Sequence, residues 1–277
     1  MHGRVDHANL GISLHQVGYC LSLTQQYAEA RQWYERAVAE LSKGDRHGRV
    51  DHSSLGVSLH QVGMCISSLG NHGQALPWFE RAATEAKKGD TYGLIDHESL
   101  GMSLNQVGDC LANMGDHANA REWFQRAVAA AEQGDTHGRI DHESVGSSLH
   151  QDGESAFQLG NFIEAQSLFE RAAVEKEKGD LYKRRDRESI GRSLSRVGDC
   201  LASLGRDADA RLWFERAVAE AEMGDIHGRS DPEIFLNVLQ NAAACLQRLK
   251  EFDRANELRS KASKVKHASA LASSLSR

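Results

Sequence analysis

A unit of 45 residues repeats along this chain, and such a period restricts the fold to architectures that stack copies of one supersecondary unit. The copies begin at equivalent residues: His2, His47, Tyr92, His137, Tyr182 and, for a divergent sixth copy, His227. The chain has only two prolines among 277 residues, and 26% of its residues are charged. Such a composition favours helix over strand. The sequence therefore predicts an all-α solenoid.

Each copy reads as two helices. An aspartate precedes the first helix and is expected to cap it, because its carboxylate can accept hydrogen bonds from the free amides of the first turn. These caps are Asp6, Asp51, Asp96, Asp141, Asp186 and Asp231. In the third copy Leu100, Leu104 and Val107 recur with the spacing of one buried helical stripe. A Gly-Asp pair such as Gly44-Asp45 marks the end of a second helix.

Two glycines seven residues apart lie inside the first helix of five copies: Gly11 and Gly18, Gly56 and Gly63, Gly101 and Gly108, Gly146 and Gly153, Gly191 and Gly198. A helical glycine costs about 1 kcal/mol relative to alanine, so we expect each to lie where a methyl group would obstruct close packing. The second helix carries alanine, an aromatic residue and alanine on one stripe, as in Ala75, Phe79 and Ala82. These flat positions are expected to let successive hairpins nest into one curved stack.

Helix glycines, a glycine at the turn and the alanine, aromatic, alanine pattern together resemble the tetratricopeptide repeat. The segment Ala75-Leu76-Pro77-Trp78-Phe79-Glu80-Arg81-Ala82 is similar to the longer, kinesin-light-chain type of repeat. The resemblance implies a right-handed superhelix of antiparallel helix pairs. The chain departs from the pattern at Gln25, which replaces the turn glycine, and in the sixth copy at Ala243, Lys250 and Arg259.

These patterns divide the chain into one solenoid over residues 1–262 and a tail over residues 263–277, which either extends the final helix or is disordered. The repeats are expected at 2–46, 47–91, 92–136, 137–181 and 182–226, followed by a charged capping pair at 227–262. The first copy is as regular as the third, so its apolar flank requires a cover. Either the chain is the carboxyl-terminal part of a longer protein, or this flank associates with itself or with a partner.

The resemblance also implies that partners bind along a concave inner wall made by the first helices. The residues assigned to this wall are Ile12, His15, Tyr19, Val57, His60, Met64, Met102, Asn105, Asp109, His150, Glu154, Phe157, Arg192 and Asp199. The wall positions vary among the copies while the packing stripe does not. Variation on a fixed frame is expected of a binding face, although a solvated face would also vary.

The proposed wall changes character along the chain. The first two copies offer apolar side chains, whereas the third to fifth offer Asp109, Glu154 and Asp199. We therefore expect a protein or peptide ligand with an apolar anchor at one end and lysine or arginine beyond it. Charge reversal at the three acidic residues should weaken its binding.

Charge and hydropathy exclude several other partners. A net charge of -6 and a pI near 6.2 provide no cationic surface for nucleic acid. No apolar run approaches the roughly 20 residues that span a bilayer, and no signal peptide is present, so a cytoplasmic protein without membrane contact is expected. Cys20, Cys65, Cys110 and Cys200 recur at one register, which predicts small buried side chains rather than disulfides.

The chain has 14 histidines, several of them in the loop segments His2–His7, His47–His52 and His137–His142. Histidine and aspartate could ligate zinc or act as acid and base. The third copy instead reads Tyr92-Gly93-Leu94-Ile95-Asp96-His97, so we expect a ring that packs on the next loop and no metal. His15, His60 and His150 are either ligand donors or half-buried helix residues. No nucleophile elbow or phosphate-binding loop occurs, which predicts no enzyme activity and no cofactor.

The sequence thus predicts a protein–protein interaction scaffold that binds a peptide or protein segment in its groove. The resemblance further implies a role as the recognition arm of a larger regulatory or signalling protein. A structural module that self-associates through the N-terminal flank is the alternative, and a metal-dependent module is a third hypothesis.

Overall fold

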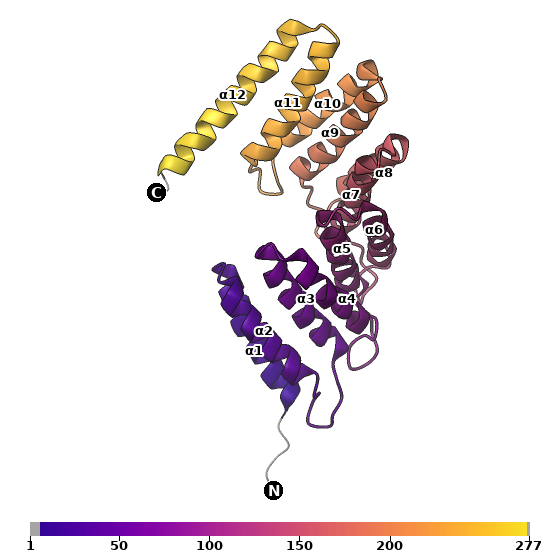
Figure 1. Ribbon diagram of the computed structural model, residues 1–277, viewed down its shortest axis with the longest axis vertical. Helices are drawn as coiled ribbons and strands as arrows, with labels where there is room; N and C mark the ends of the chain where they lie inside the picture. Colours follow the sequence, from indigo (N-terminus) through magenta and orange to yellow (C-terminus); the bar gives the residue numbers. More distant parts are fainter. Residues whose placement is uncertain (1–5, 276–277) are drawn as a thin grey trace. The chain divides into compact units, whose positions relative to one another are not determined.

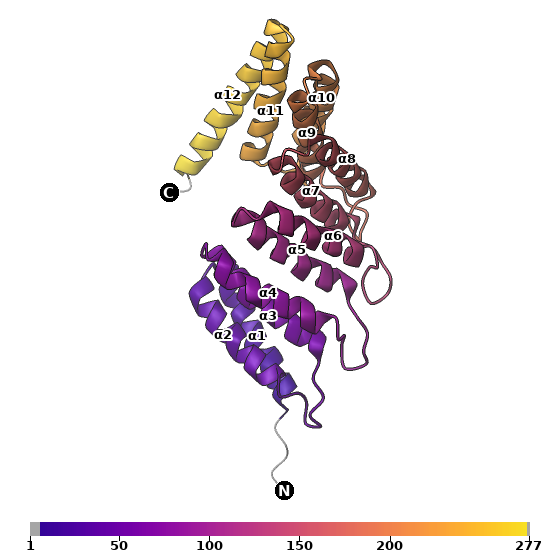
Figure 2. The same ribbon diagram turned by 45° about the vertical axis from the view of Figure 1, so that its right-hand side comes forward.

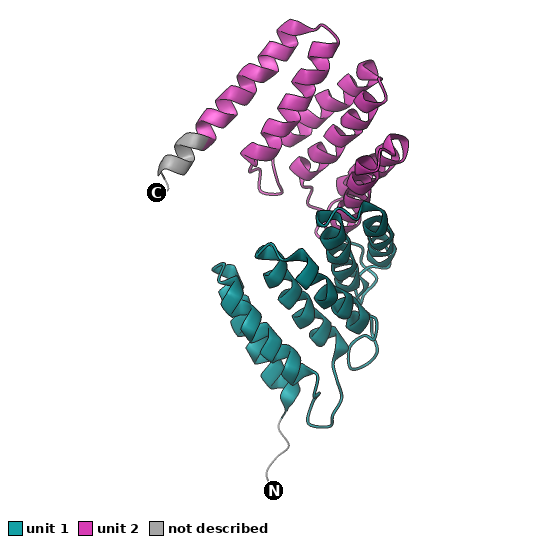
Figure 3. Cartoon of the chain, viewed as in Figure 1, with its two compact units in different colours: residues 1–141 teal, residues 142–277 magenta. Residues whose placement is uncertain are grey.

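The computed structural model describes residues 6–275, and side chains as far as residue 269, and this part of the chain contains helices and no strands (Figure 1). Two compact units divide the chain, residues 1–141 and 142–277 (Figure 3). Unit 1 contains α1 (His7–Leu23), α2 (Tyr27–Leu41), α3 (His52–Ser68), α4 (His72–Ala86), α5 (His97–Asn113) and α6 (His117–Ala131). Unit 2 contains α7 (His142–Gln158), α8 (Phe162–Lys178), α9 (Arg187–Ser203), α10 (Asp207–Glu222), α11 (Pro232–Arg248) and α12 (Phe252–Leu275).

Each unit is a solenoid of stacked antiparallel helix pairs (Figures 1 and 2). In unit 1 the pairs are α1 with α2, α3 with α4 and α5 with α6, and each second helix also contacts the first helix of the next pair. The same arrangement holds in unit 2 for α7 with α8, α9 with α10 and α11 with α12. The all-α solenoid prediction is therefore confirmed, and the single continuous domain over residues 1–262 remains a prediction.

Aspartate side chains start the first helices, as the sequence predicts. The Asp51 carboxylate accepts hydrogen bonds from the backbone N–H groups of Ser53 and Ser54, at 3.1 and 3.2 Å. Equivalent side-chain caps are formed by Asp6, Asp96, Asp186 and Asp231. Each cap satisfies amides that have no partner within the helix.

The helix glycines serve as contact points between the two helices of one hairpin. A Cβ at Gly108 would lie 2.5 Å from Cε1 of Phe124, and one at Gly63 would lie 2.7 Å from Cε1 of Phe79. The other glycine of each pair meets the second-helix backbone, as at Gly101, where a Cβ would lie 3.2 Å from the Ala127 carbonyl oxygen. Close packing is thus confirmed. The expectation that these glycines join successive hairpins is wrong, because their contacts lie within a hairpin.

Alanines flank each of these aromatic rings. In α4, Ala75, Phe79 and Ala82 have no exposed surface at all. Equivalent buried sets occur in α2, α6, α8 and α10. The ring of each second helix is therefore held between two flat positions of its own helix and a glycine of the first helix.

The turn inside each hairpin requires a left-handed backbone conformation. Gly70 has a φ of +79° there, whereas Gln25 and Lys250 replace the glycine and are held at φ values of 60° and 63°. Side chains with a Cβ rarely adopt this region. These two turns are therefore strained relative to the glycine turns.

Aspartates also organise the loops between hairpins. Asp45 accepts hydrogen bonds from the backbone N–H groups of His47 and Arg49, at 2.8 and 2.9 Å, and its carboxylate pairs with the Arg49 guanidinium at 2.8 Å. The hydrogen bond from the Arg49 backbone is the main reason that the pKa of Asp45 falls to about 2. The expected packing of rings on the next loop is wrong for Tyr92 and Tyr182, which are 84% and 77% exposed. The loop is closed by the aspartate and needs no ring.

The two ends of the described chain differ. The final helix α12 continues through the predicted tail to Leu275, which confirms the helical alternative for these residues, while 276–277 lie outside the described part. On α1, Leu10 and Val17 are 43% and 40% exposed, whereas the equivalent Leu55 and Val62 are 4% and 0% exposed. The predicted buried stripe is therefore only partly buried in the first copy, because no hairpin covers this flank in the described residues.

The cysteines follow the same pattern. Cys65, Cys110 and Cys200 are buried free thiols, as predicted, and burial raises the pKa of Cys200 to about 12. Cys245, which the prediction did not include, is buried as well. Cys20 is exposed on the open flank of α1, so the prediction of a buried side chain is wrong there.

Candidate functional site

The first helices of unit 1 expose a column of apolar side chains at 45-residue spacing. Ile12 on α1, Val57 on α3 and Met102 on α5 are 43%, 38% and 51% exposed. Tyr19 is also exposed, and Met64, Asn105 and Asp109 are half-buried. Because each helix starts at the same point of its repeat, the same register faces outward each time. The structure thus brings the predicted apolar wall residues of the first three copies onto one face of unit 1.

The predicted wall histidines take part in hydrogen bonds between neighbouring hairpins, and His15 and His60 also line the two pockets described below. Nδ1 of His60 lies 3.1 Å from the Ser103 hydroxyl, and the same bond joins His15 to Ser58 at 2.9 Å and His150 to Ser193 at 3.0 Å. Since the Ser103 hydroxyl donates to the Ser99 carbonyl, His60 donates from Nδ1. Each bridge connects the first helices of neighbouring hairpins. These residues are therefore links in the frame.

The packing of the same rings keeps them uncharged. His60 and His150 are buried, and their rings lie edge-on to Phe79 and Phe169 with centroids 5.3 and 5.1 Å apart. Burial lowers the pKa of His60 to about 4 and lowers that of His150 well below its usual value. Of the two roles that the sequence left open, the helix-packing one fits both residues.

The loop histidines also have partners in the frame. His7, His52 and His142 follow the capping aspartates, and their Nδ1 atoms lie 2.6, 2.7 and 2.8 Å from Glu40, Glu85 and Glu175 of the paired second helix. Hydrogen bonds from Lys43 and His7 lower the pKa of Glu40. In residues 6–275 no group of three or more histidine, cysteine, aspartate or glutamate side chains is placed to hold a metal ion.

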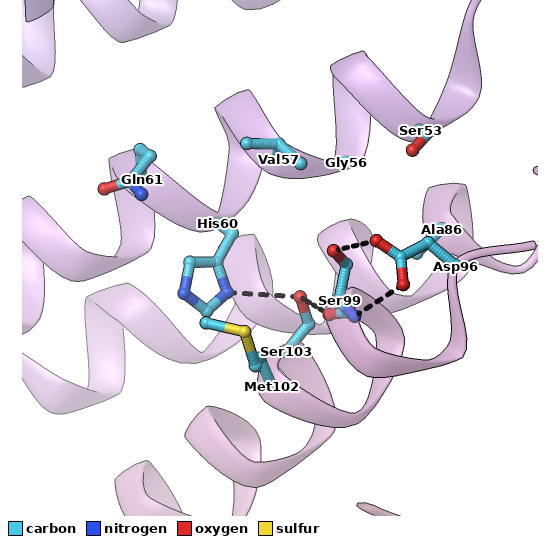
Figure 4. A pocket seen from close by; sticks show the side chains of 10 residues that line it. All are labelled: Ser53, Gly56, Val57, His60, Gln61, Ala86, Asp96, Ser99, Met102 and Ser103. Carbon is cyan, nitrogen blue, oxygen red and sulfur yellow. Dashed lines mark hydrogen bonds between the residues drawn. The ribbon is translucent and has the colours of Figure 1, made fainter. Parts of the chain in front are cut away.

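Two neighbouring pockets lie along the apolar column of unit 1. A pocket of about 230 Å³ lies between α1 and α3, with Ile12, Gln16 and Val57 among its lining residues. A second pocket of about 100 Å³ lies between α3 and α5 and is lined by residues that include Val57, Gln61 and Met102 (Figure 4). Val57 contributes to both. The face therefore offers two adjoining apolar depressions.

A column of glutamines, absent from the predicted wall, runs along this face, and two of its members, Gln16 and Gln61, line these pockets. Gln16, Gln61 and Gln106 recur one position after the wall histidines or asparagine, and no protein group in the described chain hydrogen-bonds to their amides. The signal lay in the repeated His-Gln or Asn-Gln pair. The wall positions followed from the resemblance to the family and did not include this register, although the glutamine is constant in the first four copies.

The two acidic wall residues predicted in unit 2, Glu154 and Asp199, pair with an arginine that the predicted wall did not include. The guanidinium of Arg196 on α9 binds both carboxylate oxygens of Glu154 on α7, at 2.6 and 2.7 Å, and reaches Asp199 at 2.9 Å. It also lies 4.2 Å from the centre of the Phe157 ring. Burial raises the pKa of Asp199, against the opposing effect of Arg196. The acidic wall expected at Glu154 and Asp199 is therefore an internal ion-pair network, and the nearby Arg192 is exposed.

Unit 2 also contains a buried cation. Lys176 has no exposed surface and stands where Leu41 and Ala86 occur in other copies. Its ammonium donates to the Ser193 hydroxyl at 3.2 Å and to the Ser189 carbonyl at 3.4 Å. Burial lowers the pKa of Lys176 to about 8. This arrangement was not predictable from the sequence, because a lysine near a helix end is usually solvated.

Family models for the tetratricopeptide repeat match residues 12–39, 54–133, 99–173 and 151–224. The chain belongs to the tetratricopeptide repeat family. Repeats of this family are generally non-catalytic and typically form protein–protein interaction scaffolds. No match was found among curated protein sequences. No helix of residues 6–275 is both long and apolar enough to cross a membrane.

Solved structures resemble this tetratricopeptide repeat chain over most of its length. BtubC (BKLC) from P. vanneervenii is 17% identical, with a TM-score of 0.71 over 90% of this chain and 92% of that one. A putative kinesin light chain from Podosopora anserina with nearly identical TPR-like repeats is 18% identical, with a TM-score of 0.56 over 79% and 97%. YrrB, described as a TPR protein with an unusual peptide-binding site, is 16% identical, with a TM-score of 0.50 over 76% and 86%. At these identities the likeness shows the fold.

Proposed function

We propose that the protein is an interaction scaffold whose unit 1 binds an extended peptide segment of a partner along the α1, α3 and α5 face. One observation carries this proposal: unpaired glutamine amides border apolar pockets on the same face. A glutamine amide can both donate and accept, which matches the alternating N–H and C=O groups of a peptide backbone. The pockets supply apolar burial, and the amides fix the position of the peptide main chain.

Charge supports a largely uncharged contact on this face. Among the residues that line the two pockets, Asp96 is the ionised one. Its carboxylate already accepts hydrogen bonds from the backbone N–H groups of Glu98 and Ser99 and from the Ser99 hydroxyl. A basic ligand segment would therefore have to reach Asp109 at the α5 end. That part of the original expectation stays a prediction.

A selection from displayed random 12-residue peptides tests the proposal. The wild-type chain should enrich peptides that lose at least ~10-fold in affinity for Val57→Lys, because the new charge would enter both pockets. The matched control is Asn237→Lys, at the same register on α11 of unit 2, which should bind like wild type. Both variants alter exposed side chains, so thermal unfolding should remain close to wild type. An enrichment of no peptide, or equal binding by both variants, would refute the proposal.

The open flank of α1 supports a second candidate function, self-association. Leu10, Val17 and Cys20 are exposed there, although their counterparts in the next two copies are buried. A second copy of the chain would remove this apolar surface from water. Light scattering should then show a dimer that Val17→Glu converts to monomer. A wild-type chain that stays monomeric at high concentration would rule this function out.

A further inference from the structure

We propose that unit 1 selects peptides in the polyproline II conformation that carry an aromatic side chain and a small aliphatic side chain three residues apart. This inference rests on the peptide-binding function proposed above and specifies its ligand. It follows from the sizes, the separation and the charge of the two pockets.

The pockets differ in size in a way that assigns their occupants. The pocket between α1 and α3 measures about 230 Å³, and the pocket between α3 and α5 about 100 Å³. An apolar cavity of roughly 150 Å³ accommodates benzene. The larger pocket therefore has room for an aromatic ring, whereas the smaller one fits a side chain of the size of alanine or valine.

The separation of the pockets assigns the spacing of those side chains. His15 on α1 bonds directly to Ser58 on α3, and His60 on α3 bonds directly to Ser103 on α5, so side chains bridge neighbouring first helices, whose backbones approach less closely than those of the two helices of a hairpin. Closely packed helices have axes about 8–10 Å apart, so helices that are bridged through side chains lie at the upper end of that range, roughly 10 Å apart. Two pockets that each lie between such helices, with Val57 as a shared wall, are thus displaced by about one such interval.

Polyproline II is the extended conformation that matches this interval. It rises about 3.1 Å per residue with three residues per turn, so side chains at i and i+3 lie on the same side, roughly 9 Å apart. A β-strand places i and i+2 on one side at about 7 Å, and i and i+4 at about 13 Å. Neither strand spacing fits.

The free amides favour the same conformation. A polyproline II segment makes no internal backbone hydrogen bonds, so its carbonyl groups are available to outside donors. Gln16 lines the larger pocket and Gln61 the smaller one, which supplies one amide for each turn of the ligand. Because these donors need only carbonyl acceptors on the peptide, prolines in the ligand are tolerated.

A series of synthetic peptides tests this inference. Phenylalanine and valine are placed two, three or four residues apart in an otherwise alanine and serine host, and affinity is measured by fluorescence anisotropy. Spacing three should bind roughly tenfold tighter or more than spacings two and four, because only it fills both pockets. Prolines at the two intervening positions should preserve or tighten that binding.

Two single variants assign the pockets. Ile12→Lys should abolish the contribution of phenylalanine and keep that of valine, and Met102→Lys should do the reverse. If peptides bind and depend on Val57 but show no spacing preference, or if the intervening prolines abolish binding, this inference is overturned while the peptide-binding function stands. If no peptide of the displayed library or of the series binds, both are refuted.

Discussion

The contact between Gly108 and the Phe124 ring leaves no space for a methyl group at residue 108. Phe124 is 1% exposed and has alanines on either side, so the ring cannot easily retreat. We expect Gly108→Ala to destabilise the protein by about 1–3 kcal/mol, the usual cost of overpacking a core, despite the better helix propensity of alanine. Urea unfolding measures the difference.

The matched control is Gly73→Ala in α4. A Cβ at Gly73 would meet Met114 Sδ at 3.6 Å, an ordinary contact. This variant should be neutral or stabilised by up to ~1 kcal/mol. Equal stability of the two variants would show that the ring does not depend on the glycine.

Gln25 tests the strained turn of the first hairpin. Gln25→Gly should stabilise the protein by about 0.5–1 kcal/mol, since glycine adopts a φ of 60° without the Cβ penalty, and the gain exceeds its entropic cost in the unfolded chain. The reverse change, Gly70→Ala at φ +79°, should destabilise. Thermal unfolding of both variants decides, and a Gln25→Gly protein that melts earlier would contradict the strain argument.

The elements are joined by buried polar bridges whose protonation depends on pH. His60 is neutral in the folded state with a pKa of about 4, whereas an unfolded histidine has a pKa of 6.5. As pH falls from 6.5 towards 4, the unfolded state binds the proton first, so folding stability falls with pH. His60 alone should account for a loss on the order of 3 kcal/mol over that range.

His60→Asn isolates this effect. The third copy has Asn105 at the equivalent position, so the fold tolerates the residue. The stability difference between wild type and variant should shrink as pH is lowered from 7 to 4, because only the wild type carries the histidine. Parallel pH profiles from chemical unfolding would show that the His60 bridge does not titrate as described.

Lys176 predicts that folding stability also depends on pH at the alkaline end of the scale. Its folded pKa is about 8, with burial as the main cause, against 10.5 for the free side chain. Between pH 8 and 10.5 the unfolded state binds more protons, so this group makes folding stability rise with pH. Glu143 and Asp186 favour the charged form, and Arg192 opposes it.

Lys176→Met should remove that rise and, at pH 7, leave stability unchanged or increase it, because a buried charge is replaced by an apolar side chain of similar length. Chemical unfolding at pH 7, 8.5 and 10 checks both statements. A variant that is strongly destabilised at pH 7 would mean that the ammonium group holds α8 and α9 together through Ser189 and Ser193.

At the scale of the whole molecule, local and periodic features were predictable. The capping aspartates, the glycines opposite aromatic rings and the flanking alanines recur in step, and the caps and the glycines act within their own hairpin. The pairing of Arg196 with Glu154 and the burial of Lys176 were not, because each depends on a neighbouring helix and occurs in one copy alone. The burial of His60 and His150 also required the serine of the next first helix, which the spacing of one helix cannot reveal.

The candidate binding face was likewise predictable from the sequence only in part. The exposed apolar column of Ile12, Val57 and Met102 followed from register, whereas the neutralised charge of unit 2 did not. The glutamines were not predicted, because the wall residues were taken from the resemblance to the family and that register was not among them. Pocket size, which assigns the ligand side chains, depends on how closely two helices approach and is not encoded in any short motif.

The helix glycine and the aromatic ring that pack against each other belong to the same hairpin, so each 45-residue copy contains the contact that holds its two helices together. Exposed residues such as Ile12, Val57 and Met102 can then be substituted in one copy without disturbing the helix packing of the neighbouring copies. Chimaeras that exchange whole hairpins should fold. Because each pocket is built by two neighbouring hairpins, recognition of one ligand side chain should transfer only when both adjacent copies are exchanged together.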